Sequence, residues 1–279
     1  MEQKIILDLC GGTGSWSKPY KDAGYEVWNI TLPEFNILWT KFRAGHIFFT
    51  DKKDGKTKLN IRAYDVYGVL SAPPCTHFSF ARTNAKEERN LQDALDIVIG
   101  CLKVVWYCQF QLDKDVQKYS PLKFWALENP YYGMLSWFLG KPAFSFDPWE
   151  FGDAYKKKTA LWGKFNEPSK VYSDIEKVLT KEQIEKHKTN SQELPTLGRG
   201  VNALFTKTCE EMGHSWSMKN NQSQCAYCHI KKSDIKKMPK FDYMKSEDIH
   251  PEYYKKFDRQ ARRAITPAGF AKAFFEANK

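Results

Sequence analysis

Residues 4–14 read KIILDLCGGTG, a short apolar run that ends in a turn with three glycines. An apolar run of four to eight residues bounded by a turn is typical of a buried strand. Because glycine has no side chain, a ligand can approach the backbone of such a turn closely. The stretch therefore predicts a first strand with a candidate ligand-binding turn at its carboxyl end.

Three more runs of this kind follow, and helix-like segments separate them: YEVWNIT at 25–31, YGVLSAPP at 67–74 and FWALENP at 124–130. A fifth run, TALWGKF at 159–165, indicates another strand. The alternation of strands and helices predicts an α/β fold with a mostly parallel sheet. Each candidate site in the first half then lies at the carboxyl end of a strand.

Two segments predict helices. The segment from Glu87 to Lys118 predicts one or two of them, and Cys101 and Cys108 within it are most simply small buried hydrophobic residues. Its apolar stripe consists of Leu91, Leu95, Val98, Leu102 and Val105. The last segment, TPAGFAKAFFEAN at 266–278, predicts a C-terminal helix with Thr266 as N-cap and Pro267 in the first turn. Its apolar side consists of Phe270, Phe274 and Phe275.

The composition allows one large domain with a small additional lobe. The chain has 279 residues, 42% of them hydrophobic, and no apolar run approaches the roughly 18 to 20 residues that span a bilayer. The opening MEQKIILDLCGG lacks the regions of an export signal, and seven cysteines, an odd number, favour reduced thiols. We expect a monomeric cytoplasmic protein with no membrane partner.

Positive charge is concentrated in the later half of the chain. Residues 1–150 carry 18 Lys and Arg against 17 Asp and Glu, whereas residues 151–279 carry 25 against 16. Lysine runs at 156–158 and 231–240, with KKFDRQARR from Lys255, indicate a surface that faces a polyanion. One run alone would indicate a solvated face, but the asymmetry favours a nucleic acid.

The glycine turn does not identify its ligand. DLCGGTG at 8–14 would suit NAD, FAD, another nucleotide or S-adenosylmethionine, and a tight turn without a ligand is the alternative. The spacing lacks the six-residue dinucleotide fingerprint, and the chain has no G-x-x-x-x-G-K-[ST] phosphate loop. Both observations argue against a Rossmann dehydrogenase and a P-loop enzyme.

The loop PPCTHFS at 73–79 is more specific. Two prolines stiffen it and remove two amide donors, so Cys75 would be held just beyond the sheet as a nucleophile. A Cys75–His77 pair is the alternative, but neighbours in an extended loop point apart. The residues that could fix the loop and pack beside a planar substrate are Thr76, Phe78 and Ser79.

Glu128 in ALENP ends the next predicted strand beside the same edge of the sheet. A strand-end glutamate with apolar neighbours can have a raised pKa and hold a proton for a ring nitrogen. A glutamate that caps a following turn is the alternative. The preceding PPC loop favours the catalytic interpretation.

In this order, DLCGGTG, PPCTHFS and EN resemble the motifs of the DNA cytosine-5 methyltransferase family, particularly its compact phage and bacterial forms. The three motifs span residues 8–130, and the similarity continues through FGDAYKKKTALWG to the C-terminal helix. The resemblance implies a Rossmann-like S-adenosylmethionine-dependent methyltransferase domain at 1–165. It also implies a small basic target-recognition lobe at 166–250 and a C-terminal segment at 251–279 that returns to the catalytic domain.

The resemblance assigns roles to these residues. Cys75 would add as a thiolate to C6 of a cytosine flipped out of DNA, and Glu128 would hold the ring N3 and the exocyclic amine. Lys156 and Lys158 stand where arginines are usual and keep the charge without the bidentate fork; Lys158 would be catalytic. The residues implied for the cofactor, S-adenosylmethionine, are Asp8, Cys10, Gly11, Gly12, Thr13, Gly14, Asp65 and Pro73. Those implied for the substrate are Pro74, Thr76, Phe78, Ser79, Arg82, Asn129 and Lys156.

The chain also departs from the family pattern. Cys10 stands where an aromatic residue usually packs on adenine, and Thr76 stands where a glutamine usually follows the cysteine. VWNITLPE has only the late Glu34 as the expected acidic residue for the ribose. Asp65 or Asp54 would therefore supply the adenine contact.

The region unmatched by the family contains a candidate zinc site. Cys209-x4-His214 and Cys225-x2-Cys228 could hold one structural zinc ion tetrahedrally, with His229 as an alternative ligand. Such a site would stabilise a small basic lobe that is poor in apolar residues. A loop with incidental cysteines is the alternative, because the spacing of the first pair is irregular.

Three functions remain open. The first is a DNA cytosine-5 methyltransferase. The second is an RNA cytosine-5 methyltransferase or an enzyme that transfers another one-carbon group to cytosine. The third is a catalytically silent, zinc-containing DNA-binding or regulatory module, which the altered Cys10 and Lys158 positions keep open and the intact Cys75 and Glu128 argue against.

Overall fold

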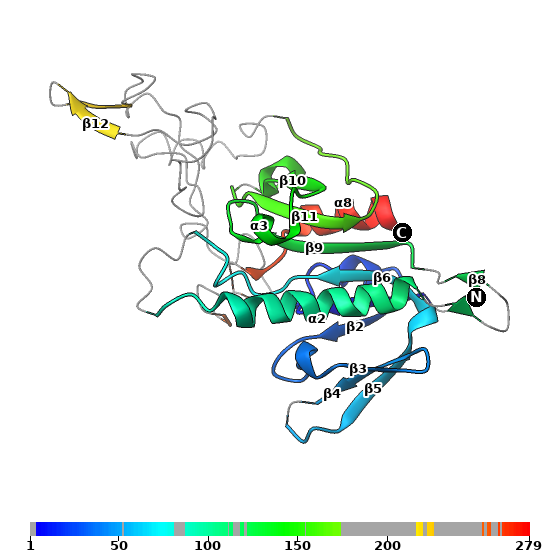
Figure 1. Cartoon of the computed structure of the whole chain (residues 1–279). Helices are drawn as coiled ribbons and strands as arrows, with labels where there is room; N and C mark the ends of the chain where they lie inside the picture. Colours follow the sequence, from blue (N-terminus) through cyan, green and yellow to red (C-terminus); the bar gives the residue numbers. More distant parts are fainter. Residues whose placement is uncertain are drawn as a thin grey trace.

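The computed structural model describes most of the first 173 residues and the C-terminal helix (Figure 1). The described residues are 4–51, 53–80, 87–110, 112–113, 118–119, 122–153, 155–173, 216–219, 222–225, 253, 256–257, 262 and 264–279. Of the four short strands among them, at 112–113, 118–119, 216–219 and 222–225, only the backbone is described.

A six-stranded mixed sheet has the strand order β10-β11-β9-β6-β1-β2. Its strands are β1 (Ile5–Leu9), β2 (Glu26–Ile30), β6 (Val66–Ser71), β9 (Phe124–Pro130), β10 (Phe144–Phe146) and β11 (Thr159–Lys164). The four strands β2, β1, β6 and β9 are parallel, whereas β11 runs antiparallel to both β9 and β10. The predicted α/β fold with a mostly parallel sheet is confirmed.

Helices and turns connect these strands. They are α1 (Lys18–Asp22), η1 (Ile37–Trp39), η2 (Ala63–Asp65), α2 (Leu91–Gln109), α3 (Leu135–Leu139), η3 (Pro148–Phe151) and α8 (Ala268–Asn278). No helix in the described part of the chain is both long and apolar enough to cross a membrane.

Three smaller sheets complete the described elements. A three-stranded antiparallel sheet contains β3 (Lys41–Arg43), β4 (His46–Thr50) and β5 (Thr57–Arg62), between β2 and β6 in sequence. The two ladders of two strands are β7 (Leu112–Asp113) with β8 (Lys118–Tyr119) and β12 (Trp216–Lys219) with β13 (Gln222–Cys225). The sequence pattern did not predict the β3–β5 sheet.

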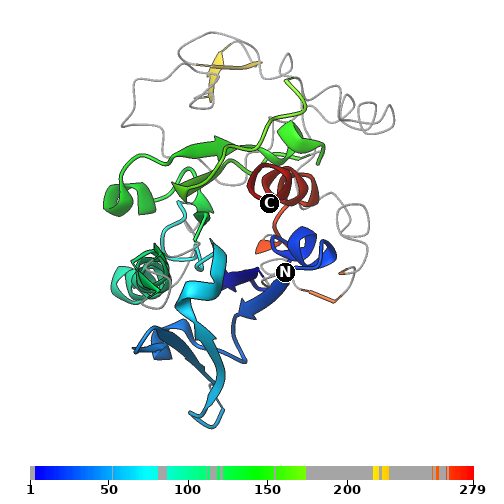
Figure 2. The same cartoon turned by 90° about the vertical axis from the view of Figure 1, so that its right-hand side faces the viewer.

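Helices cover both faces of the large sheet. Figure 2 looks along α2, which lies on one face, whereas α1 and α8 lie on the other. Leu7 and Leu9 of β1 join the apolar cluster under α2, and Ile6 between them joins the cluster under α1 and α8. Because both faces are covered, β1 carries apolar side chains on both of its faces, and the buried Asp8 is its one polar residue.

The predicted helix at 87–118 is shorter in the structure. α2 ends at Gln109, and the backbone then forms the β7–β8 ladder, so the extension to Lys118 was wrong. The apolar stripe explains the end, because its last buried residue is Cys108, and FQLDKD that follows offers little to bury.

The C-terminal helix packs its predicted apolar side onto the sheet. Phe270 and Phe274 are both fully buried, and the Phe270 ring lies 3.8 Å from that of Phe146 between centroids. Phe275 is partly buried against the same cluster.

The predicted N-cap of this helix was wrong by one residue. Pro267 occupies the N-cap position with an extended ψ of 134°, and Thr266 precedes it. The amide of Gly269 donates to Oδ2 of Asp153 at 3.0 Å, so a carboxylate from another segment does the work of a capping side chain. Burial raises the pKa of Asp153 to about 6, although this hydrogen bond opposes the rise.

Candidate functional site

The strands β1 and β6 end level with each other, and β9 continues to Pro130, three residues beyond them. The register pairs Leu9 with Ser71, and Ser71 with Leu127. The glycine turn (residues 8–17) and the cysteine loop (residues 72–79) therefore emerge at one edge of the sheet, which we call the carboxyl edge. The chain crosses from β1 to β2 on one side and from β6 to β9 on the other, and this change of direction is where open α/β sheets bind ligands.

The glycine turn closes on itself and has an open outer side. The amide of Gly14 donates to the carbonyl of Gly11 at 2.9 Å. Gly12 and Gly14 have φ values of +55° and +71°, which favour glycine. A Cβ at Gly12 would meet nothing within 4 Å, so a ligand has access to this part of the backbone.

Asp8 lies buried under the turn. Its Oδ2 accepts a hydrogen bond from the Ser17 hydroxyl at 2.5 Å, and its Oδ1 has no hydrogen-bond partner in the described part of the chain. A Cβ on Gly11 would lie 2.2 Å from Oδ1, so only glycine fits above the carboxylate. Burial raises the pKa of Asp8 to about 6, and the Ser17 hydrogen bond opposes the rise. The turn therefore has a buried carboxylate beneath it whose pKa lies above its usual range.

The end of β2 holds the same turn. The Asn29 side chain donates to the carbonyl of Gly12 at 3.0 Å, and the Thr31 hydroxyl accepts from the Gly12 amide at 3.3 Å. Sequence reasoning looked for an acidic residue here and missed both. The signal was available, because NIT ends the second strand with two polar side chains.

Cys10 has a left-handed backbone, with φ of +56°, and its amide donates to the carbonyl of Ile30. The side chain is half-buried, and its Sγ lies 4.0 Å from Sγ of Cys101 on α2. The residue at the family's aromatic position thus contacts the helix beneath the turn.

A tight turn follows the candidate nucleophile in the cysteine loop. The carbonyl of Cys75 accepts from the amides of Phe78 at 3.0 Å and Ser79 at 2.8 Å. Cys75 is half-buried and Phe78 fully buried. Of the neighbouring side chains, Pro73 is buried, and Pro74 and Thr76 are exposed.

His77 lies against the start of α2. Its Nδ1 accepts from the Asn90 amide at 2.9 Å, and its carbonyl accepts from the Arg89 guanidinium at 2.7 Å. The ring is therefore engaged in fixing the loop to α2, which argues against a Cys75–His77 pair.

The cysteine loop is also fixed to the segment that carries Glu128. The buried Asn129 side chain donates to the carbonyl of Pro73 at 3.1 Å. Further along, the amide of Met134 donates to the carbonyl of Phe78 at 2.9 Å. The structure thus brings the PPC loop and the EN strand end together, as expected for neighbouring parallel strands.

Glu128 pairs with Lys157, the middle lysine of the run at 156–158, to which the sequence analysis gave no role in the site. Nζ of Lys157 lies 3.8 Å from Oε1 of Glu128, and both side chains are about 15% exposed. Glu128 lies opposite Leu161 of β11. In an extended segment every second residue shares a face, so Lys157 lies on the side of Leu161 and Glu128. Strand alternation identifies Lys157 only together with the register of β11 against β9, which the sequence does not give.

Lys156 and Lys158 belong to a different cluster. Nζ of Lys158 lies 3.7 Å from Oδ2 of Asp147. Burial raises the pKa of Asp147, with Lys158 and Lys156 opposing the rise, and burial lowers the pKa of Lys156. The structure therefore places Lys156 and Lys158 near Asp147, and Lys157 beside Glu128.

Asp65 does not lie with the glycine turn. It ends η2 immediately before β6, and its Oδ1 is 3.9 Å from Nη1 of Arg62. β6 has six residues, so about 20 Å of strand separates Asp65 from the carboxyl edge. Asp54, the alternative, accepts from the amide of Lys56 in the β4–β5 connection.

Other predicted residues lie outside the described part of the chain. These are Arg82, Cys209, His214 and Cys228, together with the alternative ligand His229. Cys225 is described only as the last backbone position of β13. Within the described residues, no group of three or more His, Cys, Asp and Glu side chains could hold a metal ion. The zinc site stays a prediction.

Exposed aromatic side chains flank the cysteine loop. Trp137 and Phe138 of α3 are 57% and 46% exposed. The Trp137 ring lies 5.9 Å from that of Phe80, and the Phe138 ring lies 6.4 Å from that of Phe78. Flat apolar surfaces therefore stand beside Phe78 and Phe80, at the end of the cysteine loop.

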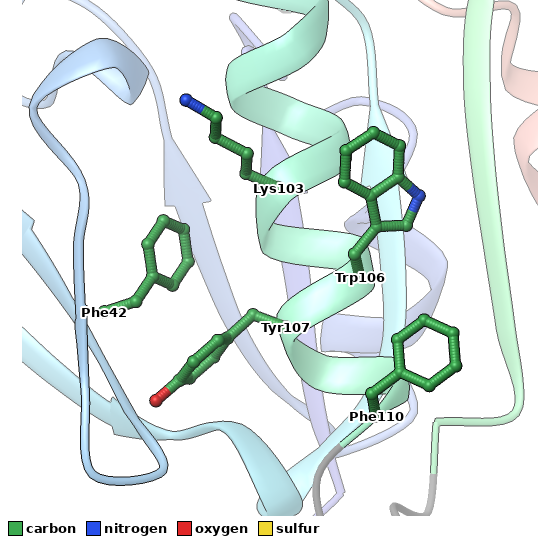
Figure 3. A pocket seen from close by; sticks show the side chains of 5 residues that line it. All are labelled: Phe42, Lys103, Trp106, Tyr107 and Phe110. Carbon is green, nitrogen blue, oxygen red and sulfur yellow. The ribbon is translucent and has the colours of Figure 1, made fainter.

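A shallow hollow lies elsewhere, at the far end of α2 (Figure 3). Its lining consists of Phe42, Lys103, Trp106, Tyr107 and Phe110. α2 begins beside His77, and the rise of a helix puts Trp106 about 24 Å further along. The hollow is thus separate from the carboxyl edge.

Comparison with protein-family models gives no match, and comparison with curated protein sequences gives none either. The functional argument therefore stands on the residues at the carboxyl edge.

Proposed function

We propose that the chain is an S-adenosylmethionine-dependent methyltransferase with a Rossmann-like fold that acts on C5 of cytosine in DNA. The observation that carries the proposal is the hydrogen bond from Asn129 to the carbonyl of Pro73. It joins the loop of a candidate thiol nucleophile to the strand end of a candidate acid, Glu128. The glycine turn lies one strand away at the same edge.

The glycine turn fits S-adenosylmethionine better than a phosphate-bearing cofactor. In its ionised form, Asp8 beneath the turn would repel a phosphate, whereas S-adenosylmethionine carries a positive sulfonium. The backbone of Gly11 and Gly12 and the Asn29 side chain are the groups that would surround it, with Asp8 buried beneath them. The bound cofactor supplies an electrophilic methyl group.

The chain's own residues would perform the chemistry on the base. Cys75 would attack C6 as a thiolate, and Glu128 would hold N3 and the exocyclic amine as charge builds on the ring. C5 then becomes nucleophilic enough to accept a methyl group. Loss of the C5 proton and departure of the Cys75 thiolate restore the aromatic ring.

Lys157 takes the place that the sequence analysis gave to Lys158. Its ammonium group lies 3.8 Å from Oε1 of Glu128. A cation there would stabilise negative charge that develops on O2 and N3.

The nucleic acid partner is supported by charge and by aromatic surface. The chain carries a net charge of +10, and Trp137 and Phe138 offer faces on which bases could stack. A base inside a duplex is out of reach of Cys75, so the target cytosine would have to be flipped out.

The test is methyl transfer from isotope-labelled S-adenosylmethionine, followed by nucleoside analysis of the product. DNA of mixed sequence, RNA of mixed sequence and no nucleic acid form the three arms, and Cys75→Ala is the enzyme control. Labelled 5-methyldeoxycytidine supports the proposal. Label only in RNA, or on a group other than methyl, supports the second function, and cofactor binding without transfer to either polymer supports a silent module.

A further inference from the structure

Cys10 and Cys101 form a close pair of thiols under the glycine turn. Their sulfur atoms are 4.0 Å apart although 91 residues separate them in sequence. Cys101 is fully buried on α2, whereas Cys10 is half-buried in the turn. The catalytic chemistry uses neither thiol.

We propose that Cys10 and Cys101 are an oxidation-sensitive dithiol, and that their disulfide closes the glycine turn to its cofactor. The first half of the proposal concerns only the two thiols. The second half rests on the proposed function, because it takes S-adenosylmethionine as the ligand of the turn.

The geometry requires the turn, rather than the helix, to move. A disulfide joins sulfur atoms at about 2.05 Å, so the pair must approach by about 2 Å. Cys101 is packed in the apolar cluster that joins α2 to β1 and β6. Cys10 is followed by Gly11 and Gly12, which have no side chains to restrain them. A bond to α2 would draw Cys10 inward and change the backbone at Gly11 and Gly12.

The oxidant that we propose is a small peroxide, which would react first at Cys10, because Cys10 is the partly exposed thiol of the pair. The Cys10 thiolate attacks one oxygen of hydrogen peroxide, the O–O bond breaks, and Cys10 becomes a sulfenic acid while the other oxygen leaves as water. The Cys101 sulfur then attacks the Cys10 sulfur; the S–S bond forms, the S–O bond breaks and a second water leaves. Two thiols are oxidised by two electrons, and one peroxide is reduced to two waters.

The order of the two steps follows from burial. Contact with Cys10 and removal from water both raise the pKa of Cys101, so it remains a thiol until its neighbour is oxidised. Cys101 therefore acts as the resolving thiol.

The chain offers a matched control in Cys108. It lies two helical turns beyond Cys101 on α2 and is equally buried. Burial likewise raises its pKa. Cys108→Ala therefore removes a thiol from the same helix face without touching the pair.

The experiment treats the reduced full chain with hydrogen peroxide, blocks remaining thiols with N-ethylmaleimide and maps disulfide-linked peptides by mass spectrometry. We expect a Cys10–Cys101 link in the wild type and in Cys108→Ala, and none in Cys101→Ala. Cys101→Ser replaces Cys101→Ala if the alanine variant does not fold. No Cys10–Cys101 link in the wild type would overturn the proposal.

The second readout is the Kd for S-adenosylmethionine. Oxidation of the catalytic residue Cys75 should not change this Kd. Oxidised wild type and Cys108→Ala should bind at least about tenfold more weakly, with recovery in dithiothreitol, whereas oxidised Cys101→Ala keeps its Kd. An unchanged Kd in cross-linked wild type would overturn the proposal that the disulfide closes the glycine turn to its cofactor. Failure of the reduced wild type to bind S-adenosylmethionine would instead count against the proposed function, since the peptide map is measured separately.

Discussion

The two sides of the carboxyl edge are held in different ways. The glycine turn is fixed by nearby sequence: Ser17 reaches Asp8 across nine residues, and Asn29 reaches Gly12 across 17. The cysteine loop is fixed from β9, where Asn129 reaches Pro73 across 56 residues. The side-chain hydrogen bonds that hold Asp8 and Gly12 are thus local, although Cys10 also contacts Cys101 from 91 residues away, whereas the nucleophile side needs the assembled sheet. Changes to one side should therefore leave the other working.

Removing the nucleophile should have the largest effect on methyl transfer and no effect on cofactor binding. In Cys75→Ala we expect methyl transfer to fall by at least about 10⁴-fold, because no covalent intermediate can form. The Kd for S-adenosylmethionine should stay unchanged, since the glycine turn is held by other residues. Single-turnover transfer and calorimetric binding measure the two effects, and persistent transfer would remove the covalent mechanism.

Substitutions of Lys157 and Lys158 should change kcat to different extents, because the two lysines have different partners. Lys157→Ala should lower kcat by about 10² to 10³-fold, because it removes the cation beside Glu128. Lys158→Ala, which loses the contact to Asp147, is the matched control and should retain most of kcat. Steady-state kinetics on both variants decides, and a larger loss in Lys158→Ala would reinstate the assignment made from the sequence.

Asp8, the buried carboxylate on the cofactor side, should make the free energy of unfolding depend on pH. The pKa of Asp8 rises from 3.8 to about 6 on folding, so the native state holds its proton more tightly than the unfolded state. The free energy of unfolding should therefore fall as pH rises from about 4 to about 6, by up to about 3 kcal/mol, and level off above. Asp8→Asn should lack this part of the slope.

Urea unfolding of wild type and Asp8→Asn at several pH values measures that difference. Asp153, whose pKa also rises to about 6, contributes equally to both proteins and cancels. Parallel pH profiles would contradict the account of Asp8.

The smallest effect should come from the link between the cysteine loop and β9. Asn129→Ala removes one hydrogen bond to Pro73 and should lower kcat by about two- to tenfold, because the contact between Met134 and Phe78 still holds the loop. Asn29→Ala is the counterpart and should instead weaken cofactor binding. Rapid-quench kinetics and calorimetry compare the two, and the same defect in both variants would show that the two sides are not independent.

The parallel core of the fold could be predicted because its evidence is local. Five apolar runs became β1, β2, β6, β9 and β11. Most residues of β1, β6, β9 and β11 are buried, as expected for strands covered on both faces, whereas β2 at the edge of the sheet buries only Ile30. The β3–β5 sheet was missed, because its short strands mix charged and apolar residues, as LNIR at the end of β5 does. The predicted helix extended past the end of α2, because the sequence after Gln109 contains no local stop signal.

The site divides along the same line. Cys75 and Glu128 could be placed at one edge because each follows an apolar run. Lys157 could not be told from Lys156 and Lys158 without the register of β11 against β9. Asp65 was misplaced although it precedes the strand predicted at 67–74, which puts it at the amino end of β6 and away from the carboxyl edge. Contacts between distant segments, such as Cys10 with Cys101, have no local signal at all.

The most direct test of the central claim is covalent trapping. The protein is mixed with S-adenosylmethionine and DNA that contains 5-fluorocytosine, whose fluorine cannot leave C5 as a proton does, and the adduct is mapped by mass spectrometry. The account predicts an adduct that resists denaturation and joins the base to Cys75. No adduct under conditions where the cofactor binds, or an adduct at another residue, would contradict it.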